Sequence, residues 1–62
     1  PNAVLLVDSH PVVREGLKRL LALSPHLEVC GECGDVARAL DLIERHRPQV
    51  VVAGMDLDGL SG

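Results

Sequence analysis

The chain has 62 residues, 47% of them hydrophobic and none of them Phe, Trp or Tyr, so any core must be built mainly from Val, Leu and Ala. Six basic and nine acidic residues give a net charge of -3, which excludes the basic footprint of a nucleic-acid-binding segment. No apolar run approaches the roughly 18 residues of a membrane span, and no secretory signal is recognisable, so we expect a cytoplasmic protein that does not contact membranes.

The first predicted elements are a strand and an amphipathic helix. Residues 3–7 form a continuous aliphatic run, typical of a strand covered on both faces. A helix should begin at Pro11, since a missing N–H is tolerated in the first turn, with His10 extended before it. Ser24 and Pro25 should stop this helix. Its expected buried stripe is Val13, Leu17, Leu20 and Leu21, and its expected solvent face is Arg14, Glu15, Lys18 and Arg19.

The remaining residues predict a strand, a turn, a second helix and a third strand. The second strand is expected over residues 27–30 and the turn over residues 31–34, after which Asp35 can cap the helix. Arg47 and Pro48 should end the helix, and residues 50–53 should form the last strand. The expected buried stripe is Val36, Leu40 and Ile43, and Asp41 with Arg45 should form an i, i+4 ion pair.

The predicted order is therefore β-α-β-α-β, in one small domain without an internal repeat or linker. Right-handed crossovers favour one parallel sheet with helices on both faces. In such sheets chemistry collects beyond the carboxyl ends of the strands. Asp8 follows the first strand at this position, whereas Gly54 follows the third.

Residues 7–17, with the sequence Val-Asp-Ser-His-Pro-Val-Val-Arg-Glu-Gly-Leu, resemble the opening of bacterial response regulator receiver domains of the LuxR/NarL/FixJ type. The resemblance continues through residues 27–32, 47–52 and 58–62 without a gap. It implies a flavodoxin-like (CheY-like) α/β fold with strand order 2-1-3, of which residues 1–62 are the N-terminal half. It also implies that the other receiver half and a DNA-binding helix-turn-helix domain lie outside this chain.

In that family two adjacent acidic residues after the first strand bind Mg²⁺, and an Asp after the third strand accepts a phosphoryl group. Carried over by position, the acidic pair becomes Asp8 and Ser9, and the phosphoacceptor position becomes Gly54. The backbone carbonyl of Asp56 corresponds to a further metal ligand, and Asp58 replaces a proline that is usual in the family. The departures from the family pattern therefore fall at its phosphorylation site.

Glycine has no side chain that could be phosphorylated, and Mg²⁺ prefers several carboxylate oxygens in octahedral array. A site reduced to Asp8 and Ser9 should bind Mg²⁺ weakly or not at all. We therefore expect a non-enzymatic, aspartate-less receiver of a two-component transcription regulator that takes no other cofactor. It should act through a homodimer or another protein partner, or through a small-molecule effector, and should reach DNA only through the absent domain. A shifted alignment that makes Asp56 the acceptor is the alternative at this site.

Cys30 and Cys33 carry the C-x-x-C spacing of redox pairs and of half a zinc site, which supports a competing hypothesis of a thiol redox or metal-binding module. Cys33 lies just before the second helix, where a helix N-terminus favours a lower thiol pKa. Structural zinc normally needs four ligands, however, and both positions hold ordinary small or apolar residues in the family that the chain resembles.

Overall fold

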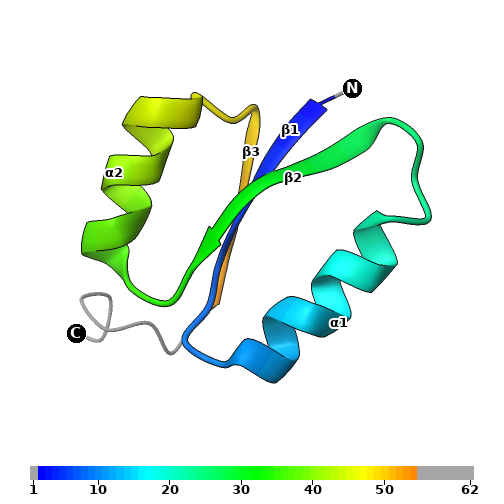
Figure 1. The fold of residues 1–62 in the computed structure, drawn as a ribbon, viewed down its shortest axis with the longest axis horizontal. Coiled ribbons are helices and arrows are strands. Elements are labelled where there is room, and N and C mark those ends of the chain that lie inside the picture. Colours follow the sequence, from blue (N-terminus) through cyan, green and yellow to red (C-terminus); the bar gives the residue numbers. More distant parts are fainter. Residues whose placement is uncertain (1, 55–62) are drawn as a thin grey trace.

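The computed structural model describes residues 2–54. Five elements follow one another along the chain (Figure 1): β1 (Asn2–Val7), α1 (Pro11–Leu21), β2 (Leu27–Cys33), α2 (Val36–His46) and β3 (Val50–Ala53). The predicted order of elements is therefore confirmed. None of the helices in this part of the chain is long and apolar enough to cross a membrane.

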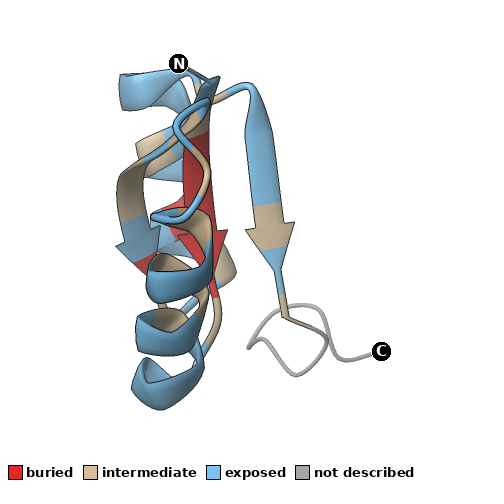
Figure 2. Cartoon of the chain, turned by 90° about the vertical axis from the view of Figure 1, so that its right-hand side faces the viewer, coloured by how far each residue is buried: buried red, intermediate tan, exposed pale blue. Residues whose placement is uncertain are grey.

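The strands form one parallel sheet in the order β2-β1-β3, as predicted. The helices lie on opposite sides of the sheet (Figure 1), and both lie over β1 and β2, while β3 pairs with β1 and forms the sheet edge beyond the helices (Figure 2). Because β1 is hydrogen-bonded on both edges and covered on both faces, it is the most buried element, with Val4, Leu5, Leu6 and Val7 almost inaccessible to solvent.

A bulge in β2 changes the pairing between β2 and β1. Val4 pairs with Val29, but Leu5 pairs with Gly31, so Cys30 is an extra residue without a partner in β1. The pairing then continues in step to Cys33, which lies opposite Val7. The predicted turn over residues 31–34 is therefore wrong, because the bulge absorbs one residue and the strand continues to Cys33.

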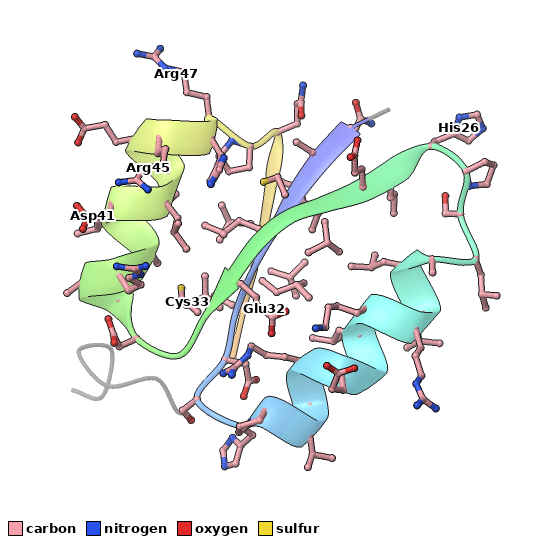
Figure 3. The ribbon with its side chains drawn as sticks, in the orientation of Figure 1. His26, Glu32, Cys33, Asp41, Arg45 and Arg47 are labelled. Atoms are coloured by element: carbon pink, nitrogen blue, oxygen red, sulfur yellow. The ribbon has the colours of Figure 1, made fainter. Side chains whose placement is uncertain are left out.

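The buried faces of both helices differ from the predicted stripes. In α1 the half-buried side chains are Arg14, Leu17, Lys18 and Leu21. Val13 and Leu20 are 43% and 65% exposed. The helix packs on β2 where Glu32 points toward it (Figure 3), and the cationic side chains turn inward to meet this carboxylate. The predicted assignment of Arg14 and Lys18 to the solvent face is therefore wrong.

In α2 the buried position is Ala39, with Val36 and Leu42 half-buried, while Leu40 is 62% exposed. The small side chain of Ala39 lets the helix approach the cluster of Leu5, Val7 and Cys33 on the sheet. The helix carries apolar residues on two faces, so the sequence pattern alone could not identify the one that packs.

The ends of α2 form as predicted, whereas the ion pair predicted on its surface does not. The Asp35 carboxylate accepts a hydrogen bond of 2.7 Å from the backbone N–H of Arg38, so it caps the N-terminus. Asp41 and Arg45 lie on the outer face of the helix (Figure 3) but form no ion pair in the described part of the chain. At the C-terminus Arg47 has a left-handed backbone with φ of 47°.

The left-handed residue at the end of α2 gives a stability prediction. Arg47→Gly should raise the free energy of unfolding by roughly 0.5–1 kcal/mol, because glycine adopts positive φ without a Cβ penalty. Arg45→Gly deletes the same side chain two residues earlier, inside the helix, and should lower that free energy by about 1 kcal/mol. Urea denaturation followed by circular dichroism measures both, and destabilisation by Arg47→Gly would contradict the argument.

Candidate functional site

The carboxyl ends of the three strands meet, and they place Asp8 and Gly54 side by side. The backbone N–H of Asp8 donates to the carbonyl of Cys33 over 3.0 Å, and that of Gly54 donates to the carbonyl of Val7 over 2.8 Å. Both links continue the parallel pairing of the sheet by one residue. The expected neighbourhood of these two positions is thus present in the structure.

The carboxylate of Asp8 is bound by the chain itself. Its Oδ1 accepts a hydrogen bond of 2.8 Å from the backbone N–H of His10 and lies 3.2 Å from Nδ1 of the same residue. The backbone N–H of His10, followed by its side chain, lowers the pKa of Asp8 below its ordinary value. The Oγ of Ser9 lies 3.3 Å from Nδ1 of His10, within hydrogen-bond distance.

The other oxygen of Asp8 points at Gly54. A Cβ atom built on Gly54 would contact Oδ2 of Asp8 and would lie 3.0 Å from its Cγ. The backbone of Gly54 is not in the positive-φ region, so any residue could adopt its conformation. A side chain at this position would therefore require the Asp8 carboxylate to move, whereas the backbone geometry would allow it.

The described residues do not fit a magnesium ion. Mg²⁺ demands several oxygen ligands in near-octahedral array, whereas one oxygen of Asp8 is already held by His10 and the hydroxyl of Ser9 faces the imidazole. Across residues 2–54 no group of three His, Cys, Asp or Glu side chains is placed to hold a metal. Asp56, the third predicted ligand, and Asp58 lie outside the described residues.

A network of hydrogen-bonded charged side chains connects this site to α1 and β2. The sequence pattern did not predict it. Arg14 donates from Nη1 to the backbone carbonyl of Asp8 over 2.5 Å and from Nε to Glu32 over 2.9 Å. Lys18 donates to the other oxygen of Glu32 over 2.6 Å and also lies 2.9 Å from Glu15. We call Arg14, Lys18 and Glu32 the ion cluster.

The ion cluster shifts the titration of its members in a consistent direction. Hydrogen bonds from Lys18 and then from Arg14 hold the pKa of Glu32 below its ordinary value. Hydrogen bonds to Glu32 and then to Glu15 raise the pKa of Lys18. The i, i+4 spacing of Arg14 and Lys18 put both cations on one helical face in the sequence, but only the fold shows that Glu32 faces them.

The cysteines occupy the α2 face of β2, where Figure 3 shows Cys33 pointing toward the helix. Cys33 is buried in the core cluster with Leu5 and Val7, and Cys30 packs against that cluster because the bulge turns it to the same face. Burial raises the pKa of the Cys33 thiol, so the predicted lowering by the helix terminus is wrong. The thiol instead donates weakly to the carbonyl of Asp35 at 3.6 Å.

The geometry of β2 opposes a disulfide between Cys30 and Cys33. Residues three apart in a strand are separated by roughly 9–10 Å between Cα atoms, at about 3.3 Å per residue. A disulfide tolerates about 4.4–6.8 Å. The redox alternative therefore has no support in this fold, and a raised thiol pKa opposes nucleophilic reactivity as well.

Mild oxidation should show whether Cys30 and Cys33 are a redox pair or two structural cysteines. In the native protein we expect no bond between Cys30 and Cys33, whereas the same oxidant in denaturant should form it, since an unfolded chain can bring the thiols together. Mass spectrometry of alkylated peptides measures both reactions. Formation of the bond at equal rates in the folded and unfolded protein would revive the redox hypothesis.

The ion cluster predicts a pH-dependent contribution to stability. Because the folded-state pKa of Glu32 is lowered, its contribution is complete above the unfolded-state pKa of about 4.3 and is lost as pH falls through the folded-state value. Glu32→Gln should lower the free energy of unfolding by roughly 0.5–1 kcal/mol near neutral pH. The difference from the wild-type protein should shrink toward zero in acid.

Urea denaturation over a pH series measures this difference. Glu28→Gln is the matched control, since Glu28 lies exposed on the same strand and forms no ion pair among residues 2–54, and it should change stability little at any pH. A Glu32→Gln effect that persists unchanged in acid would show that charge is not its cause.

Comparison with known proteins agrees with this geometry. The family model of the response regulator receiver domain matches residues 4–62. The chain is 42% identical over its whole length to the nitrate/nitrite response regulator protein NarP of Escherichia coli K12, and 46% identical over 59 residues to the transcriptional activator DevR/DosR of Mycobacterium tuberculosis. It spans 29% and 27% of the lengths of these relatives.

A solved structure extends the comparison to the fold. The two-component response regulator of the LuxR family from Aurantimonas sp. SI85-9A1 superposes with a TM-score of 0.89 at 38% identity, over 98% of this chain and 44% of that one. The sequence match, the strand order and the superposition agree on one assignment. The chain belongs to the response regulator receiver domain family, and its relatives are transcription regulators of the NarL/LuxR type.

Proposed function

We propose that this chain is the N-terminal half of an atypical receiver domain, in a cytoplasmic transcription regulator, that is not switched by phosphorylation. The observation that carries the proposal is Gly54, which stands at the end of β3 beside Asp8, where the family places its acceptor Asp. An acyl phosphate forms when a carboxylate oxygen attacks phosphorus and the donor's leaving group departs. Glycine offers no atom for this attack.

The neighbouring groups do not replace the lost acceptor. Asp8 is held by His10 on one oxygen and directs the other at Gly54, and the side chain of Asp8 is only 14% exposed. No described side chain completes a magnesium site that could neutralise an incoming phosphoryl group. We therefore propose a non-enzymatic module that has the receiver fold but does not accept a phosphoryl group.

In place of phosphorylation, we propose that association with another copy, a protein partner or a small-molecule effector carries the signal. Exposed apolar side chains support a role in association, because α1, α2 and β3 each leave some of theirs uncovered within the described part of the chain. These are Val12, Val13, Leu20, Leu40, Ile43, Val50 and Val51. Part of this surface would be covered by the other receiver half, and DNA would be contacted only through a further domain.

Phosphotransfer tests the proposal directly. The protein is incubated with acetyl phosphate and Mg²⁺, or with a partner kinase, beside a receiver that keeps Asp at the acceptor position as a positive control. We expect the control to gain the mass of one phosphoryl group and this protein to gain none, as measured by intact-mass spectrometry.

The shifted alignment has its own control. If an adduct forms on this protein and disappears in Asp56→Asn, then Asp56 is the acceptor and the proposal is wrong. An acyl phosphate on any other carboxylate would contradict it equally.

A further inference from the structure

We propose that Asp8 has taken over the space of the missing acceptor side chain, so that its carboxylate closes the strand-tip site and any side chain at position 54 must displace it. The inference rests on the proposed function and deepens it, because it explains how the site is kept in one arrangement without phosphate. Its basis is the contact of Asp8 Oδ2 with the position that a Cβ on Gly54 would occupy.

The first step is steric. A Cβ at position 54 would touch Oδ2 of Asp8 and lie 3.0 Å from its Cγ, so the carboxylate of Asp8 must shift to admit it, whereas the Cβ of Asp8 at 3.7 Å is at ordinary contact distance. The backbone of Gly54 does not itself require glycine. Gly16 in α1 offers a contrast, since a Cβ there would meet nothing within 4 Å.

The second step is that Asp8 is held from several directions. Its N–H donates to Cys33, its carbonyl accepts from Arg14, and its Oδ1 accepts from the N–H of His10 at the start of α1. If the Asp8 side chain turns away from Gly54, its Oδ1 also moves away from His10. The backbone N–H of His10 then loses its carboxylate acceptor. A larger residue at position 54 therefore does more than move the end of one side chain. It also disturbs the backbone at His10, where α1 begins.

The third step concerns the state of the site. Of the Asp8 carboxylate, Oδ1 is bound by the N–H of His10 and Oδ2 lies against Gly54, and within residues 2–54 no further carboxylate joins it in a metal-binding group. Through Arg14 its backbone is connected to Glu32 on β2. The arrangement of β1, α1 and β3 at the strand tips is thus set by the chain's own groups and does not depend on a phosphoryl group.

A double-mutant cycle between positions 8 and 54 tests the inference. Gly54→Ala, Asp8→Ala and the double variant are compared by hydrogen exchange of the residue 54 amide, which donates to Val7. We expect Gly54→Ala alone to speed exchange about tenfold, within the range of coupling between contacting residues, and to have little effect when Asp8→Ala is also present. Gly16→Ala is the matched control and should leave this amide unchanged.

Each result of this double-mutant cycle either supports or overturns the inference. Equal acceleration by Gly54→Ala in both backgrounds, or none in either, would overturn the inference. If Gly54→Ala prevents folding, recovery of the folded state by adding Asp8→Ala supports the inference, and failure of the double variant where Asp8→Ala alone folds refutes it.

The failure of this inference can be told apart from failure of the proposed function. An absent coupling in a protein that also resists phosphorylation rejects only the role of Asp8. A phosphoryl adduct on the wild-type protein rejects the proposed function whatever the cycle shows.

Discussion

The structure depends on the burial of β1 between two parallel neighbours. Its four aliphatic residues from Val4 to Val7 are covered on both faces, and its backbone is hydrogen-bonded to β2 and β3 on both edges. Parallel pairing in register brings all three carboxyl ends to one edge of the sheet. The neighbourhood of Asp8 and Gly54 is therefore a consequence of the sheet and does not require any attraction between the two residues.

The two faces of the sheet are held by different forces. Toward α2 the contact is apolar, with Ala39 packed against Leu5, Val7 and Cys33. Toward α1 the contact includes ion pairs, because Arg14 and Lys18 converge on Glu32 beside the half-buried Leu17 and Leu21. Such half-exposed ion pairs contribute modestly to stability, but their directional hydrogen bonds define where the helix lies on β2. The same Arg14 reaches the carbonyl of Asp8, so the position of α1 and the strand-tip site are physically connected.

Membership of the receiver family establishes the scaffold but not the chemistry. The chain keeps the strand order, the helix that begins at Pro11 and the first carboxylate at Asp8. It has Gly at position 54 and Ser at position 9, where the resemblance to the family places an acceptor Asp and a second carboxylate. Function at this site therefore depends on the individual residues that this chain places there, and not on the fold alone.

The sequence by itself determined the type and order of the elements, the cap at Asp35, the end of α2 at Arg47 and the presence of glycine directly after β3. These features depend on local patterns of apolar residues, caps and prolines, or on the identity of one residue. Only the tertiary structure decided which faces of the helices pack, where β2 ends and what surrounds Asp8. The helices have two apolar faces, the bulge at Cys30 depends on pairing with β1, and the partners of Arg14 and Gly54 are distant along the chain. Contacts of this kind become definite only when the strands are brought together, which is why no local pattern revealed them.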